Sequence, residues 1–152
     1  MSTNPEARAW IRVRADALRR NYARIVDAVG PGVAVLPMVK ADAYGLGVHE
    51  VVARLEPLGP WGFGVATVRE GIALREAGLE RPIVVCSPVP FGEIGDALRA
   101  GLQLSVSSLR ALDRIRDEAD EAGEGAAIHV DVDTGMGRSG FDWRREIGRA
   151  HV

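Results

Sequence analysis

Apolar runs alternate along this chain with longer stretches in which apolar residues recur at helical spacing. Short apolar runs bounded by glycine and proline are typical of buried strands, and a repeat of three to four residues is typical of amphipathic helices. The pattern predicts strands at Trp10–Arg14, Val33–Val39, Trp61–Ala66, Pro82–Cys86, Leu102–Val106 and Ala126–Val132. It predicts helices at Ala17–Val29, Val48–Leu55, Thr67–Ala77, Phe91–Ala100 and Leu109–Ala122.

The last five predicted strands begin roughly 20 to 28 residues apart, with a helix after each strand but the last. This alternation is typical of β-α units in a parallel sheet, either open and doubly wound or closed as a (β/α)8 barrel. The open nucleotide-binding form is disfavoured, because Gly45-Leu46-Gly47 lacks the third glycine of a dinucleotide fingerprint. A complete barrel needs about 250 residues. The 152-residue chain is therefore predicted to be α/β, with the N-terminal β-α units of a partial (β/α)8 TIM-type barrel.

Lys40 follows the apolar run Val33–Val39 and is the only lysine of the chain. By position alone it is more often a solvated loop residue, and Pro37 argues against a strand because proline removes a ladder donor. The C-terminal end of a parallel barrel strand is, however, where such enzymes place their chemistry. A neutral lysine amine attacks aldehydes, whereas arginine stays charged. The use of arginine elsewhere favours a chemical role for Lys40, and a small-residue loop with Tyr44 is expected to follow it.

A second polar motif, Asp131–Phe141, follows the last predicted strand. Its three glycines allow a tight turn in which the backbone approaches a ligand. Arg138 would project from this loop at the C-terminal end of a strand, where its planar fork suits a carboxylate or a phenolate oxygen. The alternative is a glycine-rich loop with a surface arginine.

Composition narrows the class of protein. A formal net charge of -2 gives no reason to expect a nucleic-acid or membrane partner. No apolar run is as long as a transmembrane helix, which needs about 18 residues. The N-terminus lacks the apolar core of a signal peptide. Cys86, the only cysteine, is predicted to be a small buried core residue. The lack of an internal disulfide fits the cytoplasm, and no metal site is expected.

Two stretches together resemble motifs of alanine racemase, a pyridoxal-phosphate enzyme of fold type III. They are Val39-Lys40-Ala41-Asp42-Ala43-Tyr44-Gly45 and Asp133-Thr134-Gly135-Met136-Gly137-Arg138. The resemblance covers about Ala9 to Phe141 and implies an N-terminal barrel followed by a mostly β domain, in a head-to-tail homodimer. It also implies pyridoxal 5'-phosphate as cofactor and interconversion of L-alanine and D-alanine, which supplies D-alanine for the peptidoglycan of the cell wall.

The resemblance assigns roles to individual residues. Lys40 would be the Schiff-base lysine and one of two bases that move the α-proton. Tyr44 would hydrogen-bond the cofactor phosphate, and Arg138 would lie beside the cofactor's phenolic oxygen and the substrate carboxylate. Removal of the α-proton from one face and its return to the other would invert the centre.

Two departures from the family pattern concern the same site. Leu46 stands where members often have histidine, with little expected consequence. Asp131 stands where many have a carbamylated lysine, which is in effect a carboxylate on a long arm. We hypothesise that Asp131 helps to orient Arg138; the alternative is an aspartate that only ends a strand.

Several parts of the family's enzyme have no counterpart in the sequence. These are the second base (a tyrosine of the partner subunit), the arginine that faces the pyridine nitrogen, most of the phosphate cup, the rest of the barrel and the β domain. The chain by itself is therefore expected to be inactive. Residues 1–141 are predicted to be the racemase-like barrel part and residues 142–152 a short tail, in which Glu146–Val152 resembles a translated sequencing adapter. Alternative functions are a broad-specificity or serine racemase and a non-catalytic fragment that binds pyridoxal phosphate.

Overall fold

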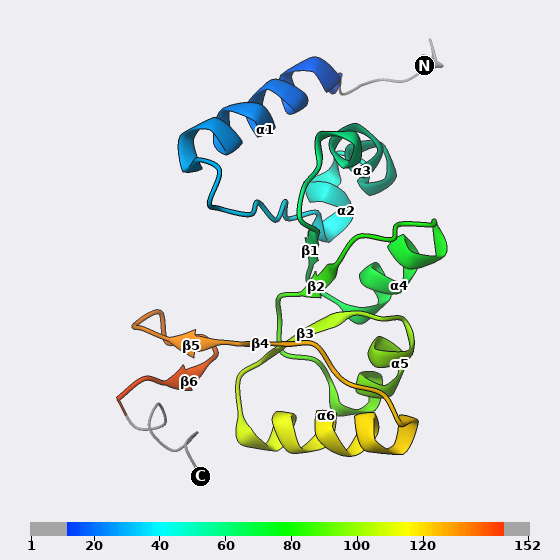
Figure 1. The fold of residues 1–152 in the computed structure, drawn as a ribbon, viewed down its shortest axis with the longest axis vertical. Helices are drawn as coiled ribbons and strands as arrows, with labels where there is room; N and C mark the ends of the chain where they lie inside the picture. The colour runs from blue at the N-terminus through cyan, green and yellow to red at the C-terminus, as the bar shows by residue number, and fades with distance from the viewer. Residues whose placement is uncertain (1–11, 145–152) are drawn as a thin grey trace, which may run out of the picture.

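The computed structural model describes residues 12–144, which form an alternating series of helices and strands (Figure 1). The helices are α1 (Ala15–Val29), α2 (Lys40–Gly45), α3 (Val48–Leu55), α4 (Val68–Glu76), α5 (Ile94–Arg99) and α6 (Leu109–Ala122), with 3₁₀ turns η1 (Glu56–Leu58) and η2 (Phe91–Glu93). The strands are β1 (Phe63–Val65), β2 (Ile83–Val85), β3 (Gln103–Val106), β4 (Ile128–Val130), β5 (Val132–Asp133) and β6 (Phe141–Asp142). The predicted strand Trp10–Arg14 begins outside the described residues, and its last three residues are not a strand.

Four strands form a parallel sheet in the order β1-β2-β3-β4. Gly64 lies opposite Val84, and Leu104 lies opposite Ile128. Because neighbours in the sheet are also neighbours in the chain, each helix between them is the crossover of a β-α unit. The α/β prediction with a parallel sheet is therefore confirmed.

The stretch before Lys40 runs alongside β1, although only Met38 forms a β-bridge, with Gly64. The Val39 amide donates to the Gly64 carbonyl at 2.8 Å, and the Gly64 amide donates to the Pro37 carbonyl at 2.9 Å. Pro37 has no amide hydrogen to extend the ladder. The predicted strand Val33–Val39 is thus reduced to a single bridge, which still aligns the backbone just before Lys40 with β1.

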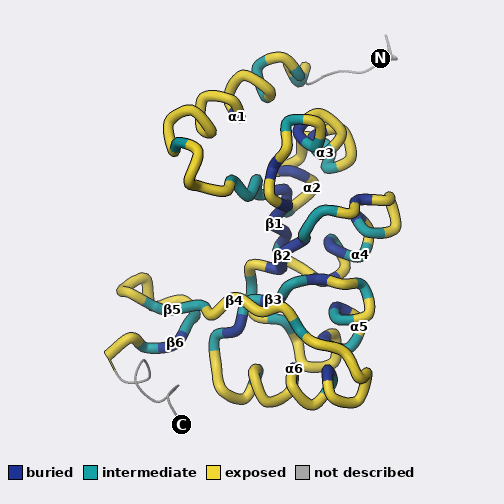
Figure 2. The backbone as a smooth tube through the Cα atoms, in the orientation of Figure 1, coloured by how far each residue is buried: buried dark blue, intermediate teal, exposed yellow. Residues whose placement is uncertain are grey.

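The core lies between the sheet and the helices that pack on it, α4 and α5 beside the strands and α6 across the far end (Figure 1). In β3, Leu104 and Val106 are buried whereas Gln103 and Ser105 are partly exposed, as expected for a strand with one covered face. Figure 2 shows the buried residues concentrated along β1 and β2. All three residues of β4 are exposed, because β4 is the edge of the sheet.

Polar side chains cap the starts of two helices. Thr67 and Glu70 form a capping box at the start of α4, and Ser108 caps α6 by accepting a hydrogen bond from the Ala111 amide at 3.2 Å. The predicted helix Phe91–Ala100 divides into η2 and the shorter α5. Within residues 12–144, none of the helices is long and apolar enough to cross a membrane.

Candidate functional site

Lys40 is partly buried and begins α2, directly after Val39, which is 2% exposed. The predicted small-residue loop after it is instead a left-handed helical turn. The φ angles are 52° at Ala41, 53° at Asp42, 52° at Ala43 and 57° at Tyr44. Left-handed backbone costs roughly 1–2 kcal/mol for each residue with a Cβ. Strain of this kind persists only where the surrounding structure enforces it, and it concentrates at functional sites.

Several hydrogen bonds hold the turn after Lys40 in this conformation. The Ala43 amide donates to the Val39 carbonyl at 2.8 Å. The Asp42 side chain accepts from the Val48 amide at 2.7 Å, which joins the turn to α3. The Ala41 amide donates to the Glu70 carboxylate at 2.7 Å, which joins the turn to α4. The turn is thus tied both to the bridged stretch before it and to two helices.

The Glu70 carboxylate accepts hydrogen bonds from three backbone amides, those of Ala41, Ala66 and Thr67. Partial burial raises the pKa of Glu70, but these three bonds and the Thr67 hydroxyl lower the pKa by more, so the net pKa lies below the ordinary value. The charged form of Glu70 is therefore favoured by folding. The local sequence gives no signal for the contact of Glu70 with Ala41, because the two residues are 29 positions apart.

Glu70→Gln is expected to remove a pH-dependent part of the stability. Because the folded-state pKa is depressed, the charged Glu70 stabilises the fold above the unfolded-state pKa, and this stabilisation is lost as the pH falls through the folded-state pKa. At neutral pH the free energy of unfolding of the variant should be about 1 kcal/mol lower than that of the wild type. Urea unfolding at a series of pH values should show that this free energy falls less steeply toward acid pH in the variant. Glu76→Gln, an exposed change on the same helix, is the control. The same pH dependence of the free energy of unfolding in the wild type and in Glu70→Gln would contradict the prediction.

The second motif forms a loop between β5 and β6, at the end of β4. The Asp131 amide donates to the Val106 carbonyl at 2.8 Å, and the Phe141 amide donates to the Asp131 carbonyl at 2.8 Å. The Asp133 carboxylate accepts from the Gly135 amide at 2.9 Å and the Gly137 amide at 3.0 Å. These bonds outweigh desolvation and lower the pKa of Asp133. The aspartate therefore shapes the loop that presents Arg138.

Gly140 fixes where this loop closes. Its φ is +114°, and a Cβ added there would lie 2.5 Å from the Asp133 amide nitrogen and 2.9 Å from the Val132 carbonyl carbon. Gly140→Ala should therefore displace the Arg138 loop at a local cost of about 1–3 kcal/mol. Faster hydrogen exchange of the Gly135 and Gly137 amides would show this. Gly125→Ala, where nothing lies within 4 Å of an added Cβ, is the control; equal exchange in both variants would contradict the prediction.

Arg138 is exposed. The Ser139 hydroxyl donates to the Asp131 carboxylate at 2.8 Å. Tyr44 is 64% exposed on the left-handed turn. The role of Asp131 in orienting Arg138 stays a prediction, as do the roles of Tyr44 and Arg138.

A hollow of about 430 Å³ lies at the ends of β2, β3 and β4, beside the second motif. It is lined by side chains that include Cys86, Asp131, Arg138 and Ser139. Desolvation raises the pKa of Cys86, and the nearby positive charge of Lys40 opposes this rise. Cys86 is exposed rather than buried, so its predicted core position is wrong. The reason is that Cys86 lies past the end of β2, on the edge where the hollow opens, with its sulfur 3.9 Å from that of Met38.

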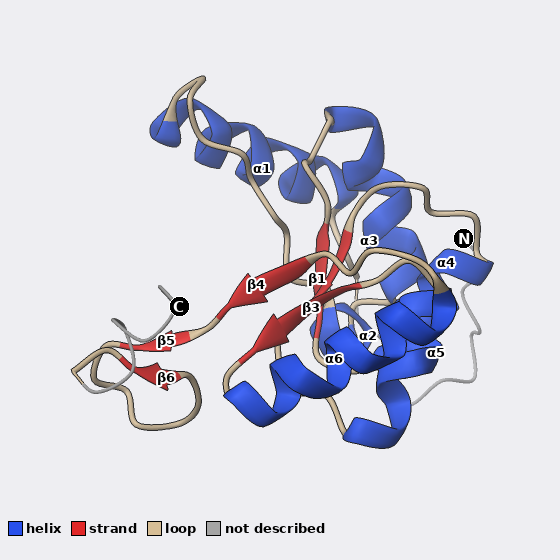
Figure 3. Cartoon of the chain, turned by 60° about the horizontal axis from the view of Figure 1, so that its bottom comes forward, coloured by secondary structure: helices blue, strands red, loops and turns tan. Residues whose placement is uncertain are grey.

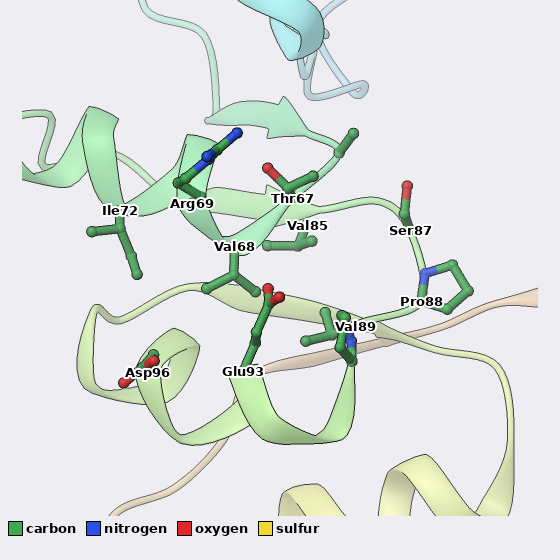
Figure 4. Close-up of a pocket in the computed structure, with 12 residues that line it drawn as sticks. Thr67, Val68, Arg69, Ile72, Val85, Ser87, Pro88, Val89, Glu93 and Asp96 are labelled. Atoms are coloured by element: carbon green, nitrogen blue, oxygen red, sulfur yellow. The ribbon is translucent and has the colours of Figure 1, made fainter.

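A larger hollow of about 780 Å³ lies between the start of α4 and the segment that leads from β2 to α5 (Figure 4). Its floor is apolar, with Val68, Ile72 and Val85, and charged Arg69 and Glu93 also line it. Its lining includes none of Lys40, Tyr44 and Arg138. Within residues 12–144 no cluster of histidine, cysteine, aspartate and glutamate could hold a metal ion.

The two motifs lie on the outer members of the parallel array. Figure 3 shows β5 and β6, which flank the loop of the second motif, extending from the end of β4. Lys40 follows the stretch paired with β1, and Arg138 follows β4 through β5. Carboxyl ends of parallel strands share one edge, so both motifs leave the sheet at the same edge. Between them lie the ends of β1, β2 and β3. If further strands closed this array, the two motifs would face a common mouth.

Comparison with known proteins agrees with this arrangement. A family model described as "Alanine racemase, N-terminal domain" matches residues 13–151. An alanine racemase of Geobacter sulfurreducens is 39% identical over 125 residues, which are 82% of this chain and 33% of that protein. The solved alanine racemase of Clostridium difficile 630 has a TM-score of 0.81 at 35% identity, covering 84% of this chain and 33% of that one. The alanine racemase of E. faecalis has a TM-score of 0.82 at 31% identity, covering 90% and 37%.

The chain thus spans about a third of the length of the curated relatives that it matches. The matched third carries β-α units of their barrel, which confirms the prediction of a partial barrel. The predicted resemblance to the N-terminal part of alanine racemase is confirmed as well. The chain therefore belongs to the alanine racemase N-terminal domain family.

Proposed function

We propose that this chain is the lysine-bearing N-terminal part of a racemase that interconverts L-alanine and D-alanine with pyridoxal 5'-phosphate. The observation that carries the proposal is the placement of Lys40, the only lysine. It follows the strand-like stretch paired with β1, on the sheet edge that also leads to Arg138. The family match over residues 13–151 supports the same assignment.

The residues at this edge fit the chemical groups of that cofactor. Lys40 supplies an amine for an aldehyde. Arg138 lines the hollow at the ends of β2, β3 and β4 and supplies a planar cation for a phenolate or a carboxylate. Tyr44 supplies a hydroxyl that can donate to a phosphate, and its exposure leaves it accessible.

Lys40 and Arg138 would divide the tasks of the reaction between them. The bound cofactor supplies an electron-withdrawing ring that takes up charge as the α-proton leaves. Lys40 would hold the cofactor and then move a proton at the α-carbon through its amine. Arg138 would bind the substrate carboxylate and fix the α-carbon relative to the Lys40 amine. Return of the proton from the opposite face requires a second base, which we assign to the partner subunit of a homodimer.

The remaining assignments of this proposal concern the whole enzyme. The product D-alanine would serve peptidoglycan synthesis, and the enzyme would act in the cytoplasm. Residues 1–141 would be the functional barrel part, whereas residues 142–152 remain a predicted tail. The segment Glu146–Val152 lies outside the described residues, so its interpretation as an adapter stays a prediction.

The test is a chimera in which residues 1–141 replace the matching third of the Geobacter sulfurreducens alanine racemase. The account expects D-alanine to form from L-alanine when pyridoxal phosphate is present. Serine is assayed in parallel, and faster turnover of serine would favour the alternative of a serine racemase. A chimera that folds as a dimer and binds the cofactor, yet racemises neither amino acid, would favour the non-catalytic alternative and contradict the proposal.

A further inference from the structure

The Glu70 carboxylate joins two segments that are far apart in the sequence. One oxygen accepts from the Ala41 amide at 2.7 Å, across 29 residues. The other accepts from the Ala66 amide at 2.8 Å and the Thr67 amide at 3.1 Å. A capping box requires only the reciprocal bonds with Thr67. The bond to Ala41 therefore goes beyond capping and connects α4 to the residue after Lys40.

The Ala41 amide lies at the start of the left-handed turn and has its hydrogen-bond acceptor outside the turn. Ala41 is the first residue with positive φ, at 52°. The bonds from the Ala43 amide to Val39 and from the Gly47 amide to Asp42 stabilise later parts of the turn. Glu70 provides the acceptor for Ala41 itself, from outside the turn. A glutamine at position 70 has one acceptor oxygen in place of two and so cannot reproduce all of these bonds.

We propose that Glu70 is a positioning residue for Lys40. Its carboxylate holds the backbone amide after Lys40 and thereby fixes the backbone from which the lysine side chain projects. The inference rests on the proposed function of Lys40 as the site of cofactor attachment. It adds a residue that touches neither cofactor nor substrate and acts through the backbone.

The test uses the 152-residue chain with pyridoxal phosphate and cyanoborohydride. Labelling of Lys40 is measured by mass spectrometry relative to labelling of the N-terminal amine, which is an internal reference in the same molecule. Hydrogen exchange of the Ala41 amide is measured without cofactor. For Glu70→Gln the proposal predicts about a tenfold lower labelling ratio and about tenfold faster Ala41 exchange, since a charged hydrogen bond is lost.

Two further variants separate positioning from simple helix capping. Thr67→Ala removes the hydroxyl that accepts from the Glu70 amide but leaves the Ala41 contact, so it should lower the unfolding midpoint with little change in the labelling ratio. Glu76→Gln should change neither quantity. Equal losses of labelling in Glu70→Gln and Thr67→Ala, both still folded, would overturn the proposal.

The outcomes also separate this inference from the proposed function. A wild-type chain whose Lys40 takes up no label contradicts the proposed function, and the Ala41 exchange then decides the inference alone. Faster exchange in Glu70→Gln than in Glu76→Gln supports the Glu70 contact, and unchanged exchange overturns it.

Discussion

Lys40→Arg in the chimera is expected to abolish racemisation. Arginine keeps the positive charge and much of the length of lysine, but its guanidinium stays protonated and forms no bond with the cofactor aldehyde. Loss of the proton-transferring group alone costs about 10²–10⁴ in rate, and loss of covalent attachment adds to it. The measurement is D-alanine formation at saturating pyridoxal phosphate.

The control variant has a lysine at another position, where we expect it not to support racemisation. Lys40→Arg combined with Arg19→Lys keeps the lysine count and puts the amine on the exposed part of α1. This double variant should be as inactive as Lys40→Arg. Racemisation within tenfold of wild type in either variant would show that another residue holds the cofactor.

Phe63→Ala is expected to leave the protein either unfolded or only marginally stable. Phe63 is 0% exposed, in β1 and next to Gly64, which carries the backbone bonds to the stretch before Lys40. Truncation of a buried phenylalanine costs about 3–5 kcal/mol, against a total stability of about 5–15 kcal/mol for a typical domain. Urea unfolding followed by circular dichroism measures the loss.

Phe91→Ala is the matched control for this change. Phe91 is 38% exposed and lies under the Arg110 guanidinium, with 4.8 Å between the guanidinium carbon and the ring centroid. Its truncation should cost about 1 kcal/mol or less. Equal unfolding midpoints for the two variants would mean that β1 is not the centre of the core.

The β-α units could be predicted because each strand and each helix start is marked by residues that are close together in the sequence. Apolar runs mark β1 to β4, and residues such as Thr67 and Ser108 mark where helices begin. The stretch before Lys40 departs from the prediction since Pro37 interrupts the ladder, leaving one bridge at Met38.

The shape of the site could not be predicted in the same way. The left-handed turn from Ala41 to Tyr44 contains no glycine, so the local sequence gives no reason to expect it. One of its hydrogen bonds runs from the Ala41 amide to Glu70, which is 29 residues away in the sequence. The apolar neighbours of Cys86 predict a core position, but Cys86 lies past the end of β2 where the sheet edge is open. Lys40 and Arg138 stand out in the sequence because their residue types have specific chemistry, whereas the hydrophobic pattern does not indicate that they lie close together.

The central claim is that the Lys40 amine is the point of cofactor attachment, and reductive trapping tests it most directly. The 152-residue chain is incubated with pyridoxal phosphate, reduced with borohydride and digested, and the mass of each peptide is measured by mass spectrometry. The account predicts a pyridoxyl adduct on the peptide that contains Lys40 and on no other side chain, since no other lysine competes. An unmodified Lys40 peptide at saturating cofactor, from a chain shown to be folded, would contradict it.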